Sequence, residues 1–185
     1  MIRLIIIRHA KTAWNKAGRI QGRSDIPLLP ESVVAARDEG RRLAGERIDA
    51  AYASPLSRAM ETAKAIVEGR GIEVQADARL LERDFGKYDG RTYDELGLAD
   101  HTKLFFALTE DVGAEPSADV FARVRSFVDD LRRTCDGKTV LVVSHGVCIS
   151  FLVYALTHDE WKESEYSMNY VPNLTACVYE LEAGV

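Results

Sequence analysis

The chain opens on a run in which five of six residues are aliphatic, and which is followed by arginine and histidine. Residues 2–7 read Ile-Arg-Leu-Ile-Ile-Ile, and the run stops at Arg8-His9. A run this apolar predicts a strand buried on both faces, which is typical of the central strands of an α/β sheet. Such sheets bind ligands just beyond the carboxyl ends of their strands, so Arg8 and His9 would stand at a binding site. A buried strand with a polar edge and an incidental histidine is the alternative that this stretch leaves open.

The rest of the pattern alternates expected helices and strands. Apolar stripes at helical spacing predict helices that begin near Glu31, at Ser54-Pro55, at Pro116-Ser117 and at residue 147. Ser54 would be an N-cap, with Pro55 in the first helical position. Short apolar runs predict further strands over 48–53, 73–75, 139–143 and 175–181. This alternation predicts one α/β domain over residues 1–185, a three-layer α/β/α sandwich with a largely parallel central sheet.

The least regular part of the sequence covers residues 77–116. It mixes charged residues with aromatic and aliphatic ones and shows no sustained period. We expect a loop with short helices that folds over the edge of the sheet. Residues 84–116 are therefore a candidate lid.

Cysteine usage and hydropathy indicate the compartment. Cys135, Cys148 and Cys177 are odd in number, lie far apart and form no CxxC pair, which favours free thiols in a reducing compartment. No apolar run reaches the roughly 18 residues needed to span a bilayer. The N-terminal run has no cleavage-site pattern. We therefore expect a cytoplasmic protein with no membrane partner.

Charge is unevenly distributed along the chain. The net charge of −5 argues against nucleic acid as a partner. Before Asp25, however, the sequence holds no acidic residue and six cationic ones, namely Arg3, Arg8, Lys11, Lys16, Arg19 and Arg23. A cationic segment on an otherwise acidic protein suits a small anionic ligand, and a solvated basic loop is the alternative.

Polar residues recur near the ends of three expected strands. Arg8-His9 follow the first strand, Arg58 lies in the first turn of the helix after the second, and His145 follows strand 139–143. Because the carboxyl ends of parallel strands share one edge, these side chains should converge. Arginine binds phosphate oxygens bidentately, and a neutral imidazole can act as a nucleophile toward phosphorus. The residues alone leave phosphoryl transfer and simple anion binding open.

Five sequence blocks resemble the histidine phosphatase (phosphoglycerate mutase-like) superfamily. They read LIIIRHAKTAWN, QG, SPLSRAMETA, LERDFG and SHG, at residues 4–15, 21–22, 54–63, 81–86 and 144–146. The blocks occur in the order of that family and cover roughly residues 1–155. The resemblance implies the same fold class, a phosphoglycerate mutase-like α/β/α sandwich.

The resemblance also implies roles for individual residues. His9 would be the phosphorylated nucleophile, and Arg8, Arg58 and His145 would surround the phosphoryl group. Glu82 would protonate the leaving oxygen and later activate water; nothing but the resemblance distinguishes it from other loop carboxylates. The expected substrate-binding residues are Thr12, Asn15, Gln21, Gly22 and Gly146.

Two requirements follow from these roles. Glu82 must carry a proton to act as an acid, and burial beneath residues 84–116 would favour that form. His9 must be neutral at its attacking nitrogen, so we expect a backbone carbonyl to hold the other ring nitrogen. Neither step calls for a metal ion or another cofactor, and we expect none.

The family that the chain resembles contains both phosphatases and mutases. Cofactor-dependent phosphoglycerate mutases carry an extended insertion between the catalytic glutamate and the second histidine, whereas only residues 83–144 lie there in this chain. The resemblance therefore favours a phosphomonoester hydrolase acting on a small phosphorylated metabolite, similar to broad-specificity or α-ribazole phosphatases. A mutase and a non-catalytic phosphate-binding module remain alternatives. The oligomeric state is open, a homodimer included.

Overall fold

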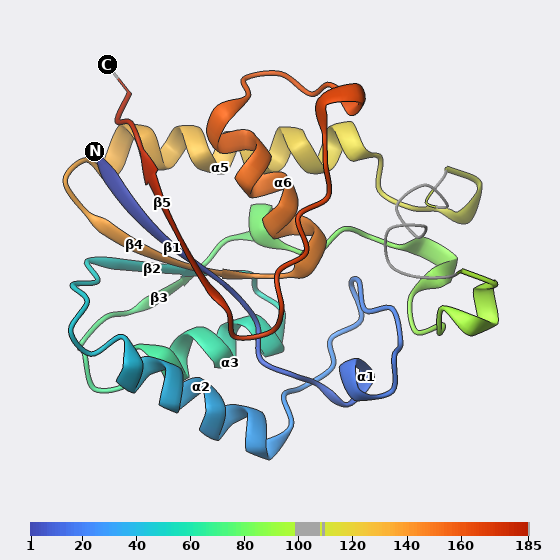
Figure 1. The fold of residues 1–185 in the computed structure, drawn as a ribbon, viewed down its shortest axis with the longest axis horizontal. Coiled ribbons are helices and arrows are strands. Elements are labelled where there is room, and N and C mark those ends of the chain that lie inside the picture. The colour runs from blue at the N-terminus through green and yellow to red at the C-terminus, as the bar shows by residue number, and fades with distance from the viewer. Residues whose placement is uncertain (99–107, 109, 185) are drawn as a thin grey trace.

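The computed structural model describes residues 1–98, 108 and 110–184, and Figure 1 shows a central sheet between two layers of helices. Within these residues the sheet has five strands: β1 (Ile2–Arg8), β2 (Ala50–Ala53), β3 (Val74–Ala76), β4 (Thr139–Ser144) and β5 (Ala176–Leu181). Their order is β3-β2-β4-β1-β5. All neighbours pair in parallel except β5, which is antiparallel to β1.

Helices cover both faces of the sheet. The long ones are α2 (Pro30–Arg42), α3 (Ser57–Ile66), α5 (Ser117–Thr134) and α6 (Gly146–Thr157), and α1 (Ala13–Lys16) is a single turn. α2 and α3 lie on one side of the sheet, and α5 and α6 lie on the other (Figure 1). The predicted three-layer α/β/α sandwich with a largely parallel sheet is confirmed. No helix in the described part of the chain is long and apolar enough to cross a membrane.

Strand β1 is buried on both faces, as its composition requires. Leu4 and Ile6 pack into the core beneath α5 and α6, whereas Ile5 and Ile7 pack into the core that α3 covers. Each of the four is at most 1% exposed. Full burial of such a side chain contributes about 1.5–3 kcal/mol, so this strand stabilises both layers at once.

One helix boundary was predicted wrongly. α3 begins at Ser57 with Leu56 as its N-cap, not at Ser54-Pro55. The reason is that Ser54 still belongs to the sheet, because its N–H donates to the carbonyl of Val143 at 3.1 Å. The Ser54 hydroxyl only accepts from the Leu56 N–H at 3.4 Å. The shift leaves Arg58 in the first turn of the helix, as expected.

The irregular region contains short 3-10 helices, as the sequence predicted. These are η1 (Ala78–Leu80), η2 (Gly86–Tyr88), η3 (Asp94–Leu96) and η4 (Glu110–Val112), and η5 (Glu163–Glu165) lies near the end of the chain. Gly86, the first residue of η2, packs closely against the end of η4. Its φ is +54°, and a Cβ there would collide with the backbone of Val112 and Gly113. Within the candidate lid 84–116, residues 99–107 and 109 lie outside the described residues.

Candidate active site

The register between β1 and β4 brings the two histidines together. Arg8 is paired with Ser144 in the parallel ladder. The His9 N–H donates to the Ser144 carbonyl at 2.9 Å, one step beyond the last ladder pair. His9 and His145 therefore follow adjacent strand ends, and their ring centroids lie 5.2 Å apart. The sequence prediction that these strand ends converge is confirmed.

The ring of His9 is fixed in one tautomer. Its Nδ1 lies 2.7 Å from the carbonyl oxygen of Ala10. Because a carbonyl can only accept, Nδ1 carries the proton and Nε2 is left with a free lone pair. Burial, followed by the positive charges of Arg58 and Arg8, holds the pKa of His9 well below its ordinary value. His9 is therefore a neutral imidazole at pH 7, with the carbonyl contact that the sequence reasoning expected.

Arg58 is fully buried and is held by three acceptors. Its Nε donates to Nδ1 of His145 at 3.2 Å, and its two terminal nitrogens donate to the carbonyls of Ser24 and Gly22 at 2.8 and 2.7 Å. Burial lowers the pKa of Arg58 to about 10, although nearby carboxylates oppose the shift. The guanidinium thus stays cationic at neutral pH and lies beside both histidines.

Donors without acceptors gather at this site. Because Nδ1 of His145 accepts from Arg58, its Nε2 must carry the proton. That Nε2, Nε of Arg8 and the amide nitrogen of Gln21 are buried and have no hydrogen-bond partner among the described residues. A buried donor left unpaired costs about 1–3 kcal/mol and is rare in proteins. Such donors around a neutral imidazole suit the oxygens of an anion.

A cavity of about 200 Å³ opens onto these groups. Six of the residues that line it are ones that the sequence had singled out as site residues: Arg8, His9, Asn15, Gln21, Glu82 and Gly146. Arg58 and His145 lie behind this lining and contact His9 or each other. The geometry therefore brings most of the expected site residues around one space.

Thr12 and Gly22 stand outside the described lining of the cavity and support other residues. The Thr12 hydroxyl donates to Oε1 of Gln21 at 2.6 Å and caps α1. The Gly22 carbonyl accepts from Arg58. Both residues had been expected to bind substrate; in the structure Thr12 contacts Gln21, which lines the cavity, and Gly22 contacts Arg58, which lies behind the lining.

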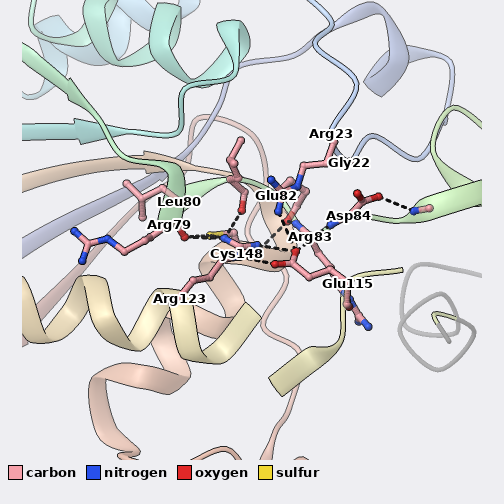
Figure 2. A network of polar contacts seen from close by, with 12 residues as sticks. Gly22, Arg23, Arg79, Leu80, Glu82, Arg83, Asp84, Glu115, Arg123 and Cys148 are labelled. Atoms are coloured by element: carbon pink, nitrogen blue, oxygen red, sulfur yellow. Dashed lines mark hydrogen bonds and ion pairs between the residues drawn. The ribbon is translucent and has the colours of Figure 1, made fainter. Parts of the chain in front are cut away.

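Glu82 is buried at the N-terminus of α6. Figure 2 shows it beside Cys148. Its Oε1 accepts from the N–H groups of Arg83 and Cys148, both at 2.9 Å, and its Oε2 accepts from the Val147 N–H at 3.1 Å. Backbone donors at a helix N-terminus stabilise negative charge. The sequence had predicted burial beneath residues 84–116; the side chain is buried, but against α6 and its N–H groups.

Residues 168–174 form a wall of the cavity that the sequence reasoning had left as a polar loop. Met168 and Tyr170 line the cavity, and the Arg8 guanidinium lies 5.3 Å above the Tyr170 ring. The Asn173 amide donates to the His9 carbonyl at 2.7 Å. The apolar residues of this stretch, which reads MNYVPNL, were the available signal. Ile20, Phe85, Tyr93, Val147 and Arg19 also line the cavity without having been predicted.

Comparison with known proteins identifies the family. A sequence model of the histidine phosphatase superfamily (branch 1) matches residues 4–184. The chain belongs to the histidine phosphatase superfamily. The predicted family is thereby confirmed, and so is the expected enzyme class, a phosphatase of this superfamily.

Relatives within the histidine phosphatase superfamily carry several names. Phosphoserine phosphatase 1 of Hydrogenobacter thermophilus is 33% identical over 162 residues, covering 84% of this chain and 76% of the relative. A probable phosphoglycerate mutase of Enterobacter is 32% identical over 158 residues, with coverages of 83% and 74%.

Solved structures of the superfamily share the fold. Bacillus stearothermophilus YhfR has a TM-score of 0.83 at 31% identity and covers 100% of this chain and 93% of its own. A phosphoserine phosphatase from Entamoeba histolytica, solved in complex with 3-phosphoglyceric acid, has a TM-score of 0.78 at 30% identity, with coverages of 96% and 90%.

Proposed function

We propose that the protein is a metal-independent phosphomonoester hydrolase that forms a phosphohistidine at His9. One observation carries the proposal: the Ala10 carbonyl fixes the proton of His9 on Nδ1, so that Nε2 is a free nucleophile. The unpartnered donors of Arg8 and His145 lie next to it and supply the charge that a phosphoryl group requires.

In the first step, Nε2 of His9 attacks phosphorus and the bond from phosphorus to the ester oxygen breaks. Negative charge is spread over the three equatorial oxygens, so catalysis depends on positioned cations and N–H donors. Arg8, Arg58 and His145 take this role. Arg58 is held by the carbonyls of Ser24 and Gly22, so its guanidinium needs little reorganisation during the reaction.

Glu82 serves both steps of the proposed reaction. In the first step, a proton on Glu82 moves to the leaving oxygen and the alcohol departs. In the second step, the carboxylate takes a proton from a water molecule, which attacks phosphorus and releases His9 and phosphate. General acid or base help of this kind contributes about 10²–10⁴-fold. The three N–H groups that hold Glu82 stabilise the carboxylate that the second step uses.

The proposed substrate is a small phosphorylated metabolite. The cavity of about 200 Å³ holds a phosphoryl group and a short alcohol. Relatives named phosphoserine phosphatase, and a neighbour solved with 3-phosphoglyceric acid, support this class. A mutase is the second candidate because curated relatives carry that name. A broad-specificity phosphatase and an α-ribazole phosphatase would also act on substrates of this class.

The test measures phosphate release in EDTA from p-nitrophenyl phosphate, phosphoserine, 3-phosphoglycerate and α-ribazole 5′-phosphate. We expect EDTA-resistant release that is lost in His9→Ala and kept in His158→Ala, a variant of a histidine remote from the cavity lining. A 3-phosphoglycerate isomerisation assay runs in parallel. Isomerisation without phosphate release would favour the mutase, and equal activity of His9→Ala and the native protein would refute the phosphohistidine route.

A further inference from the structure

A partly buried ion pair lies between the irregular region and α5. Nε and Nη2 of Arg123 donate to Oε1 and Oε2 of Glu115 at 2.8 and 3.1 Å, a two-pronged contact. Both side chains are about 15% exposed. Burial alone would raise the pKa of Glu115, but the hydrogen bond and charge of Arg123 outweigh burial and hold that pKa below its ordinary value.

The same pair holds the segment that carries Glu82. Nη1 of Arg123 donates to the carbonyls of Arg79 and Leu81, both at 2.7 Å, on the N-terminal side of Glu82. On the C-terminal side, Oε2 of Glu115 accepts from the Asp84 N–H at 3.1 Å. Figure 2 shows these contacts converging on the backbone around Glu82.

Backbone contacts of Glu115 also hold the segment that carries Glu82. The Glu115 N–H donates to the Asp84 carbonyl at 3.0 Å, and its own carbonyl accepts from Nε of Arg83 at 2.7 Å. Glu115 also pairs with Arg23 at 3.2 Å. Arg23 follows Gly22, whose carbonyl holds Arg58. One carboxylate thus ties the loop of the proposed acid to the loop that supports the phosphoryl-binding arginine.

We propose that the Glu115–Arg123 ion pair is a positioning device that sets the place of Glu82 against the leaving oxygen. The proposal rests on the function proposed above. Neither residue is among the described lining of the cavity, so both act through the backbone of residues 79–84. Proton transfer requires hydrogen-bond reach, and a displacement of about 1 Å can lower the rate about 10²-fold.

The chain offers a matched control on the same helix. Arg125 also donates through Nε to a carboxylate, that of Asp129 at 3.0 Å, and through Nη1 to two carbonyls, those of Ala155 and His158 at 3.4 and 2.9 Å. Those carbonyls lie at the C-terminal end of α6, away from Glu82. Asp129→Asn and Arg125→Lys therefore reproduce the chemical change of Glu115→Gln and Arg123→Lys without touching the segment of Glu82.

The kinetic test compares kcat/KM for two esters. The leaving group of p-nitrophenyl phosphate is an acidic phenol that needs little protonation, whereas the leaving group of phosphoserine is the serine hydroxyl, a weak acid whose oxygen must be protonated as it departs. We expect Glu115→Gln and Arg123→Lys to lower kcat/KM about 10-fold or more for phosphoserine and less than about 3-fold for p-nitrophenyl phosphate. In a Glu82→Gln background, the same changes should leave the ratio of the two values unaltered. An equal loss on both esters, or a changed ratio without Glu82, would overturn the proposal.

A second measurement does not depend on activity. The amide protons of Val147 and Cys148 donate to Glu82, so their NMR shifts and exchange rates report its position. Because Nη1 of Arg123 also lies 3.9 Å from Sγ of Cys148, the Val147 amide is the reporter for Arg123→Lys, and both amides report for Glu115→Gln. We expect these amides to change in the direction seen in Glu82→Gln, and Asp129→Asn to leave both amides unchanged. Unchanged amides refute the positioning role whatever the activity. If the amides respond but the protein hydrolyses no ester, the missing hydrolysis refutes the proposed function. The response of the amides still supports the positioning of Glu82 by the ion pair.

Discussion

Lowering the pH should destabilise this protein through its two central histidines. The pKa values of His9 and His145 lie well below the ordinary 6.5, chiefly because both rings are buried and secondly because Arg58 is close. In the unfolded chain each ring takes up a proton below about pH 6.5, whereas in the folded protein it stays neutral. The unfolded state then binds more protons, so the free energy of unfolding must fall as the pH falls.

The size of the effect follows from this linkage. Each such histidine lowers the free energy of unfolding by up to about 1.4 kcal/mol per pH unit. Between pH 7.5 and 5.0 the contribution reaches at most about 2 kcal/mol for each ring and about 4 kcal/mol for His9 and His145 together. This is a large part of the roughly 5–15 kcal/mol that stabilises a typical domain. Carboxylates with lowered pKa values, such as Glu115, lose their contribution below their ordinary value of 4.5, outside this window.

The assay is urea unfolding followed by circular dichroism at pH intervals from 7.5 to 5.0, for the native protein, His9→Gln and His145→Gln. Phosphate is left out of the buffer because an anion bound to the folded state would stabilise it. Each variant should lose about half of the pH dependence of the native protein. A free energy of unfolding that is level across this range, or a full native slope in both variants, would refute the reasoning.

Two further predictions concern single contacts. Arg58→Lys should lower kcat/KM at least about 10²-fold with the fold retained by circular dichroism, because one ammonium cannot replace the guanidinium contacts with His145, Ser24 and Gly22; activity within 3-fold of native would contradict this. Gly86→Ala should lower the free energy of unfolding by about 2–3 kcal/mol, measured in urea. Gly97→Ala, which has a similar φ but open space around its Cβ, should lower it by about 1 kcal/mol; equal losses would show that contact with η4 is unimportant.

The core of the fold and the first half of the site could be predicted because their signals are local. The aliphatic run of β1 admits few interpretations other than a strand buried on both faces. Its parallel pairing with β4 then requires His9 and His145 to meet. Both conclusions need the apolar pattern and the geometry of a parallel sheet, and both are visible in the sequence.

Other features depend on contacts between distant segments. Glu82 is anchored by N–H groups of Val147 and Cys148, far along the chain, and nothing in its own neighbourhood marks it out. The start of α3 was misplaced because the ladder bond from Ser54 to Val143 competes with helix capping. The wall at residues 168–174 was missed because its apolar residues show no helical or strand period, so nothing local indicates that Tyr170 lies against Arg8.

The sheet order has a consequence for folding during synthesis. β1 precedes the other strands of the sheet in the sequence, yet its two neighbours, β4 and β5, are Thr139–Ser144 and Ala176–Leu181. During synthesis its aliphatic side chains therefore have no partner strand until β4 has been made. Such delayed, long-range pairing slows folding and leaves apolar segments open to aggregation. The apolar segment that ends in the proposed nucleophile is thus exposed to aggregation during synthesis.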